Sequence, residues 1–178
     1  MALNRPVPTD FWINPKVNEE YSLDDKLLYI YLITNEHLQQ LGIYKISKKI
    51  IAIELNMDSE RLEKAFDNLE NKFKVIKYSD KTNEIAILDY YSFGILKGGK
   101  PVENCFDNLG KKVSDFNLLK EMYLYSKSII DEREIYSKIM TKLESQLRSL
   151  KMLDDEEENK EEKRQDNYIQ PMYDENPF

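Results

Sequence analysis

Three residue types are almost missing from this chain of 178 residues, which contains one cysteine, one histidine and one tryptophan. The single cysteine, Cys105, cannot form an intrachain disulfide bond. Together with the single histidine, His37, it also argues against a structural zinc site, which takes several such ligands. We therefore expect neither a disulfide framework nor a metal site.

Long apolar runs are also missing. No stretch approaches the roughly 18 consecutive apolar residues of a membrane-spanning helix. Residues 1–10 lack the apolar core of a secretory signal peptide, so we expect a cytoplasmic protein. The phosphate-loop pattern, the Gly-rich dinucleotide fingerprint and the His-Glu-x-x-His pattern are absent as well. We expect no enzymatic activity and no cofactor.

The net charge of -7 is concentrated at one end of the chain. Residues 154–178 hold 10 acidic and 3 basic residues, whereas residues 1–153 hold 23 of each. The acidic segment has no glycine and no apolar periodicity before Tyr168, which predicts a disordered tail. Because the remainder is neutral overall, DNA binding by it would need a local basic face.

Two helices and a strand are predicted between residues 22 and 55. Ser22 can cap the first helix, and Asp25 stands at its capping-box position. Apolar residues then recur at helical spacing: Leu23, Leu27, Leu28, Tyr31 and Leu32. Residues 42–46 are predicted as a short strand. Ser47 can cap a second helix over 48–55, whose residues available for burial are Ile50, Ile51, Ala52, Ile53 and Leu55.

A tight turn at residues 56–57 precedes a third helix, which Asp58 or Ser59 can cap and which runs to about residue 71. Its apolar residues form one stripe: Leu62, Ala65, Phe66, Leu69 and Phe73. A hairpin follows, with strands over 75–78 and 84–88 around a polar turn over 79–83.

Helix, short strand, helix, turn, helix and hairpin is the element order of a winged helix-turn-helix domain. We therefore predict an α+β, mostly helical fold with four parts. These are an N-terminal arm at 1–19, a winged-helix domain at 20–100, a helical extension at 101–153 and the disordered acidic tail at 154–178. The alternative is an unrelated α+β domain with the same element order.

The helical extension is predicted to contain a short helix over 101–112 and a single long helix over 117–153. In the long helix, apolar residues alternate four and three apart, as in a coiled-coil seam. They are Tyr136, Met140, Leu143, Leu147 and Leu150. Such a short seam leaves two options open, a helix of an intramolecular bundle or a helix of a homo-oligomer.

Several sequence blocks occur in a particular order over roughly residues 10 to 115. They are Phe11-Trp12-Ile13-Asn14-Pro15-Lys16-Val17, residues 25–35, Gly42-Ile43-Tyr44-Lys45-Ile46, Glu84-Ile85-Ala86-Ile87, Gly98-Gly99-Lys100-Pro101-Val102 and Cys105. In this order they resemble the N-terminal winged-helix part of replication initiation proteins from phages and mobile elements, the replisome organisers and DnaD-like primosome proteins. The resemblance implies DNA binding, self-association and recruitment of a helicase, a helicase loader or a primase. The sequence departs from that family after about Leu118.

Cations gather around the second helix and the hairpin. The third helix itself is acidic, with five acids and three bases over residues 58–72, which disfavours its entry between phosphates. The candidate DNA-binding residues are Lys45, Lys48, Lys49, Arg61, Lys64, Lys74, Lys77, Lys81, Lys97 and Lys100. If they share a face, nearby tyrosines are available to stack on bases, namely Tyr44, Tyr78, Tyr90 and Tyr91. The alternative is that the lysines are scattered solubilising charges and the tyrosines belong to the core.

The last residues, Asp174-Glu175-Asn176-Pro177-Phe178, resemble the C-terminal tip of bacterial single-stranded DNA-binding proteins. In such a tip, Pro177 and Phe178 would occupy an apolar pocket of a partner, and Asp174 and Glu175 would strengthen the attraction to its basic residues. We expect these four residues to bind partner proteins. The alternative is a tail that only solubilises the chain.

Taken together, these patterns predict a phage-type replication protein that binds single-stranded or origin double-stranded DNA and recruits replisome proteins through its tail. One alternative is a single-stranded DNA-binding protein that does not have an OB fold. Another is a protein assembly factor, or a transcriptional regulator, that uses the winged helix for its contacts.

Overall fold

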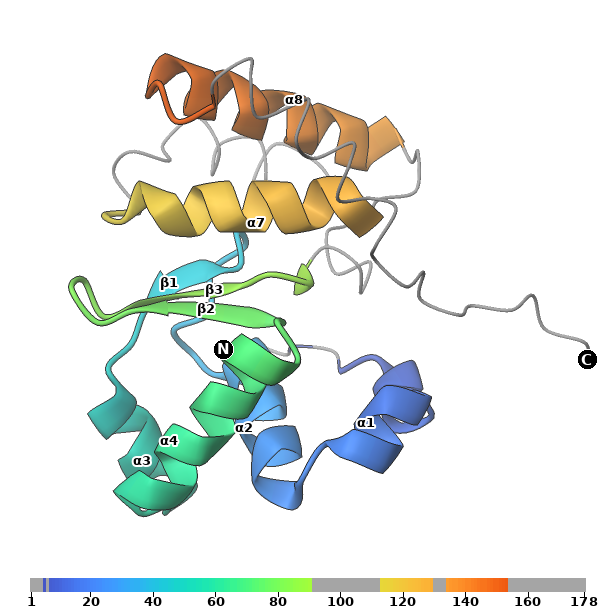
Figure 1. Cartoon of the computed structure of the whole chain (residues 1–178), viewed down its shortest axis with the longest axis vertical. Helices are drawn as coiled ribbons and strands as arrows, with labels where there is room; N and C mark the ends of the chain where they lie inside the picture. Colours follow the sequence, from blue (N-terminus) through green and yellow to red (C-terminus); the bar gives the residue numbers. More distant parts are fainter. Residues whose placement is uncertain (1–4, 6, 91–112, 130–133, 154–178) are drawn as a thin grey trace, which may run out of the picture.

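The computed structural model describes residue 5 and residues 7–90, 113–129 and 134–153, with the side chains of 129 and 134–139 left aside. The chain is an α+β protein in three layers, in which a three-stranded antiparallel sheet lies between two groups of helices (Figure 1). The expected α+β class is therefore confirmed. The helix predicted over 101–112 and the tail predicted over 154–178 lie outside the described residues.

The helices on one face of the sheet come from the first half of the chain. In order they are the 3-10 helix η1 (Thr9–Trp12), α1 (Pro15–Glu20), α2 (Leu23–Thr34), α3 (Lys48–Leu55), α4 (Ser59–Asp67) and the π-helical turn η2 (Asn68–Lys72). Part of the expected N-terminal arm packs into the core, because Phe11 and Val17 are buried. The Phe11 ring stacks on Tyr29 of α2, with ring centroids 5.5 Å apart.

Side chains cap the starts of these helices where the sequence predicts them. Ser22 and Asp25 form the predicted capping box of α2, in which the Ser22 N–H donates to the Asp25 carboxylate at 2.8 Å. Ser47 caps α3, and Asp58 caps α4 by accepting a hydrogen bond from the Arg61 N–H. Asn56 ends α3 in the left-handed conformation, which confirms the turn between the two helices.

The sheet has the strand order β1-β3-β2, with β1 at Ile43–Lys45, β2 at Ile76–Ser79 and β3 at Glu84–Ile87. Ile85 in the central strand pairs with Tyr44 on one side and with Tyr78 on the other. Directly paired residues share a sheet face, so these three face the α2–α4 layer. Their neighbours along the strands face the opposite way, and every residue of β3 is buried because both faces are covered.

The exposed sides of α2 and α3 differ from the sequence prediction. The helical spacing was expected to bury Leu23, Leu27, Ile50 and Ile53, but all four are exposed. The buried α2 residues include Leu28, Leu32 and Ile33, and in α3 only Ile51 is fully buried. The reason is that both helices carry apolar residues on more than one side, and a single sheet face can cover only one side of each helix.

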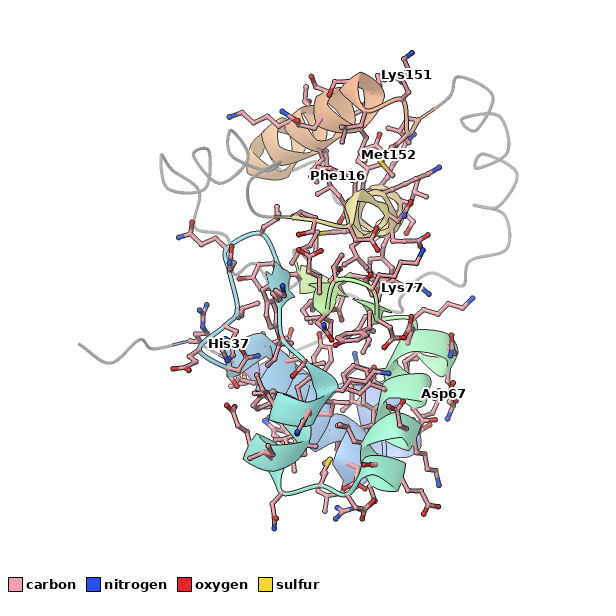
Figure 2. The ribbon with its side chains drawn as sticks, turned by 90° about the vertical axis from the view of Figure 1, so that its left-hand side faces the viewer. His37, Asp67, Lys77, Phe116, Lys151 and Met152 are labelled. Carbon is pink, nitrogen blue, oxygen red and sulfur yellow. The ribbon has the colours of Figure 1, made fainter. Side chains whose placement is uncertain are left out.

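The single long helix predicted over 117–153 is wrong, because this region contains two helices, α7 (Phe116–Ile129) and α8 (Glu134–Ser149). They lie side by side in opposite directions, with α7 against the second face of the sheet and α8 on the far side of α7 (Figure 1). Phe116 at the start of α7 and Met152 just after α8 therefore lie at the same end of the pair (Figure 2). Leu143 and Leu147 of the expected coiled-coil seam are fully buried. The seam thus packs within the chain, since folding back lets α8 cover the side of α7 that faces away from the sheet.

The chain after β3 returns to the start of β1. Gly42 has a φ of 77°, and a Cβ atom there would lie 2.8 Å from the ring of the buried Tyr90. Only glycine combines this left-handed backbone with such a close approach. The expected packing of the segment after the hairpin back onto the domain is therefore confirmed at Tyr90, whereas Tyr91 lies outside the described residues.

Candidate nucleic-acid interface

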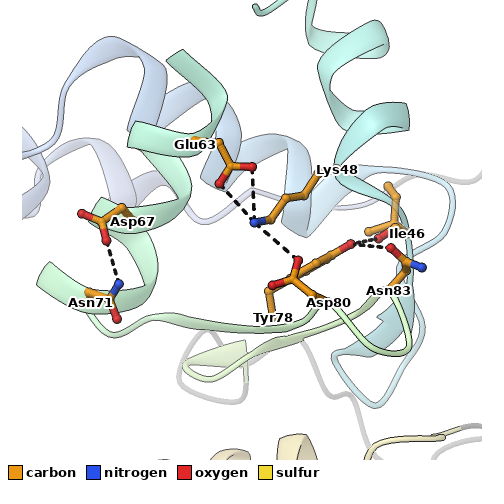
Figure 3. A network of polar contacts seen from close by, with 8 residues as sticks. All are labelled: Ile46, Lys48, Glu63, Asp67, Asn71, Tyr78, Asp80 and Asn83. Carbon is orange, nitrogen blue, oxygen red and sulfur yellow. Dashed lines mark hydrogen bonds and ion pairs between the residues drawn. The ribbon is translucent and has the colours of Figure 1, made fainter. Parts of the chain in front are cut away.

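Lys48 holds three elements together at the start of α3. Its Nζ lies 3.2 Å from the Glu63 carboxylate of α4 and 3.7 Å from the Asp80 carboxylate in the hairpin turn (Figure 3). It also lies 5.1 Å from the ring centroids of Phe66 and Tyr78. Burial lowers the pKa of Lys48, but the hydrogen bond and charge of Glu63 and the charge of Asp80 outweigh it and raise this pKa. Lys48 is therefore committed to internal contacts.

Two further predicted cations are also bound by acids. Lys77 Nζ lies 2.9 Å from the Glu70 carboxylate, and this hydrogen bond raises the pKa of Lys77. Arg61 donates twice to the Asp24 carboxylate, at 2.9 and 2.6 Å, which joins α4 to the start of α2. A neutralised cation attracts phosphate weakly, so Lys48, Lys77 and Arg61 are poor candidates for DNA contacts.

Three exposed lysines remain around the end of the hairpin. Lys45 pairs in register with Glu84 at the start of β3, Lys49 follows Lys48 in α3, and Lys81 lies in the hairpin turn. The ion pair of Lys48 with Asp80 and the hydrogen bond from the Ile46 N–H to the Asn83 carbonyl bring these segments together. Lys45 lies on the α7 side of the sheet, like Glu84, whereas Lys49 belongs to the layer on the other side, so the three lysines surround the end of the hairpin. We call Lys45, Lys49 and Lys81 the hairpin corner. Lys64 and Lys74 are exposed elsewhere, and Lys97 and Lys100 lie outside the described residues.

The prediction that tyrosines stack on bases is wrong for Tyr44, Tyr78 and Tyr90, which are all buried. Tyr44 Oη donates to the Leu32 carbonyl at 2.7 Å, and Tyr78 Oη lies 3.0 Å from the Ile46 carbonyl as its acceptor. A phenol can be buried in this way because its apolar ring packs in the core while its hydroxyl reaches a backbone acceptor.

The exposed side of α4 is acidic in the structure as it is in the sequence. Glu60, Glu63 and Asp67 are exposed, and Asp67 accepts a hydrogen bond from the Asn71 amide at 2.7 Å (Figure 3). Asp67 points outward on this helix (Figure 2). Lys64 is also exposed on α4, and its described contacts include no ion pair. A phosphate backbone would meet mainly carboxylates along this helix.

The hairpin is anchored to the start of α7 by a buried carboxylate that the sequence analysis missed. Glu84, 2% exposed, accepts hydrogen bonds from the backbone N–H groups of Ser114 and Asp115 at 2.8 Å each. Ser79 of β2 donates to the Asp115 carboxylate at 2.6 Å, which lowers the pKa of Asp115. The only sequence signal was an acid within an apolar strand. The hairpin is therefore tied to the helices on both sides of the sheet.

Other features restrict what the described part of the chain can do. Its residues contain no cluster of three or more histidine, cysteine or acidic side chains placed to hold a metal ion. None of its helices is long and apolar enough to cross a membrane. The predicted partner-binding residues Asp174, Glu175, Pro177 and Phe178 lie outside the described residues.

No protein-family model, curated protein sequence or solved structure matches this chain. The resemblance to replication initiation proteins therefore stands on the ordered sequence blocks alone.

Proposed function

We propose that residues 20–90 form a winged helix and that the chain binds DNA through the hairpin corner. The observation that supports this most directly is the order of elements, α2-β1-α3-α4-β2-β3, with β1 paired to β3 and β3 to β2. In this arrangement α3 and α4 form the helix-turn-helix, and the β2–β3 hairpin is the wing.

The distribution of charge favours phosphate contacts by the wing over base reading by α4. Lys45, Lys49 and Lys81 are exposed at the hairpin corner, and the described contacts of these lysines include no ion pair. The α4 surface, by contrast, presents carboxylates. Contacts of this kind bind the backbone without reading sequence, so we expect weak discrimination between sequences and a strong dependence on salt.

Charge reversal at the hairpin corner tests the proposal. In Lys45→Glu/Lys49→Glu/Lys81→Glu, affinity for single-stranded, double-stranded and forked oligonucleotides should fall at least about ten-fold, and the slope of affinity against salt should become flatter. The measurement is fluorescence anisotropy at several salt concentrations. Equal binding by parent and variant at every salt concentration would remove this surface from consideration.

A matched control separates a local effect from a change in net charge. Lys16, Lys74 and Lys127 are exposed in α1, before β2 and late in α7, away from the hairpin turn. Changing these three to glutamate alters the net charge by the same amount. The control variant should keep most of the affinity if the hairpin corner is the binding surface, and should lose as much if binding depends only on overall charge.

A role in replication is part of the same proposal. It is supported by the resemblance of residues 10–115 to replication initiation proteins, and it assigns recruitment of replication partners to the acidic segment 154–178. The comparison of three DNA forms bears on this role as well, because preference for forked or single-stranded DNA suits an initiator or primosome component. Preference for double-stranded DNA suits a transcriptional regulator instead.

The acidic α4 favours a second candidate, a winged helix that mediates protein assembly and does not bind DNA. In this case no oligonucleotide should bind above the level of a charge-matched unrelated protein, even at low salt. Neutralising Glu60 and Asp67 together, as Glu60→Gln/Asp67→Asn, should then leave the DNA signal at that background level.

A further inference from the structure

Four large apolar side chains are exposed on the outer sides of α2 and α3. Leu23 is 79% exposed, Leu27 43%, Ile50 40% and Ile53 70%. These helices belong to the layer on the far side of the sheet from α7 and α8, so neither of those helices covers them (Figure 1). Scattered surface leucines need no explanation, but a contiguous apolar surface marks an interaction site.

Helix geometry places these residues in rows, and two polar contacts connect the elements that carry them. Leu23, Leu27 and Tyr31 follow one another at four-residue spacing and form one row along α2. Ile50 and Glu54 form a second row on α3, and Tyr31 Oη donates to the Glu54 carboxylate at 2.6 Å, which connects the ends of the two rows.

The end of α3 then leads through the turn to Arg61, whose guanidinium binds Asp24 beside Leu23. The two contacts therefore tie the end of α3 to Tyr31 and the start of α4 to Asp24, at the two ends of the α2 row. We call Leu23, Leu27, Ile50 and Ile53 together with Glu54 the α2–α3 surface.

Negative charge lies at one end of this surface. Glu54 binds the Tyr31 hydroxyl, and the described contacts of its carboxylate include no cation. Burial, the hydrogen bond and charge of Glu54, and the charge of Glu36 raise the pKa of Tyr31, which places Glu36 near the same end. Glu36 is highly exposed, with His37 as its neighbour at 3.9 Å. At the other end, Asp24 and Arg61 neutralise each other.

We propose that the α2–α3 surface binds an amphipathic helix of a partner protein, with its apolar side on the leucines and isoleucines and a lysine or arginine against Glu54 and Glu36. Exposed apolar side chains that recur three and four residues apart on two helices suit a partner helix whose anchors have the same spacing. The carboxylates disfavour nucleic acid and anionic lipid. They equally disfavour the acidic segment 154–178 of the chain itself, because like charges would meet.

The test uses the full chain and a fluorescein-labelled synthetic helix of leucine, alanine and lysine. Two counterpart peptides replace every lysine by glutamate or every leucine by serine. We expect fluorescence anisotropy to show binding of the basic amphipathic peptide and not of its counterparts. Leu23→Glu/Ile53→Glu should weaken binding at least about ten-fold, and Glu54→Gln should weaken it roughly three-fold and make it less sensitive to salt.

Ile13→Glu supplies a matched control, since Ile13 is 76% exposed and lies on the separate segment between η1 and α1. It should leave peptide binding unchanged, and all these variants should keep the DNA affinity of the parent. The test thus fails or succeeds independently of the proposed DNA binding.

Several results would overturn the proposal. One is equal binding of the acidic peptide, an equal loss with Ile13→Glu, or no binding of the basic peptide at all. Another is a dimer in analytical ultracentrifugation that Leu23→Glu/Ile53→Glu converts to a monomer, because the occupant would then be a second copy of this chain. A third is a large loss of thermal stability in that variant, since another segment of the same chain would then cover the surface.

Discussion

Two buried aspartates make different contacts in the core. Asp25, 1% exposed, accepts hydrogen bonds from the Ser22 N–H and from the Asn68 amide, which join the start of α2 to η2. Asp89, 8% exposed, follows β3 and accepts a hydrogen bond from Tyr29 Oη at 2.7 Å. Burial raises the pKa of Asp89 to about 7, although the hydrogen bond from Tyr29 opposes the rise.

The stability of the protein should fall with rising pH because of Asp89. Its pKa is raised from 3.8 to about 7 in the folded chain, so the folded state retains a proton that the unfolded state releases. The stabilisation is complete below about pH 4 and is lost as the pH rises through 7. The difference between pH 4 and pH 8 is of the order of 4 kcal/mol, at 1.36 kcal/mol per pKa unit.

Urea denaturation of the parent and of Asp89→Asn between pH 4 and pH 8 measures this effect. The asparagine side chain stays neutral, so the variant should lose much of the pH dependence and be the more stable protein at pH 8. Asp10→Asn, at an exposed position in η1, is the control and should follow the parent. If the stabilities of the parent and Asp89→Asn changed with pH in parallel, the raised pKa of Asp89 would not be the cause of the pH dependence.

Between elements, the hairpin is the joint that connects the two helical layers. Lys48 ties its turn to α3 and α4 on one face. Glu84 and Ser79 tie its strands to the start of α7 on the other face. A hairpin held from both sides presents its turn in a defined position, which fits its proposed contact with a regular DNA backbone.

Removal of the Glu84 carboxylate should loosen α7 from the sheet. Glu84→Ala leaves the N–H groups of Ser114 and Asp115 without their acceptor, and we expect a loss of about 1–3 kcal/mol in the free energy of unfolding. Glu84→Gln keeps one acceptor oxygen and should lose less. Chemical denaturation ranks the two variants, and equal losses would show that side-chain volume, and not hydrogen bonding, fixes α7.

At the scale of the whole molecule, the layers share one core. Buried side chains from α2, from all three strands and from α7 and α8 belong to a single apolar cluster. We therefore expect one cooperative unfolding transition, because neither helical layer can keep its apolar side buried without the sheet.

Leu147→Ala tests whether the whole molecule unfolds in one cooperative transition. Leu147 of α8 is fully buried, so its truncation should cost about 2–5 kcal/mol. The single tryptophan, Trp12, lies in η1 on the other side of the sheet. Its fluorescence and the far-UV circular dichroism should shift together to lower denaturant concentration. Leu150→Ala, at a position 39% exposed, should shift both only slightly. A tryptophan transition that stays in place would show that α7 and α8 unfold separately.

Features that depend on neighbouring residues could be predicted from the sequence. Ser22 with Asp25, Ser47 and Asp58 cap their helices as predicted, and residues 48–55 form a helix with the predicted bounds. Capping and turn preferences depend on residues only a few positions apart, so they can be predicted from the sequence. The lysines around the second helix and the hairpin were also found in this way, since their positions are a property of the sequence.

Partnership between distant residues was decided only by the tertiary structure. Lys48 and Lys77 are bound by Glu63 and Glu70, Tyr44 is in the core, and Leu23 and Ile53 are in solvent. A charge is neutralised, or a ring buried, by groups far away in the sequence, and periodicity cannot say which of two apolar helix sides meets the sheet. The sequence by itself determined where α2, α3 and α4 begin, because their capping residues lie next to them, whereas packing decided which lysines and which apolar side chains are left for partners.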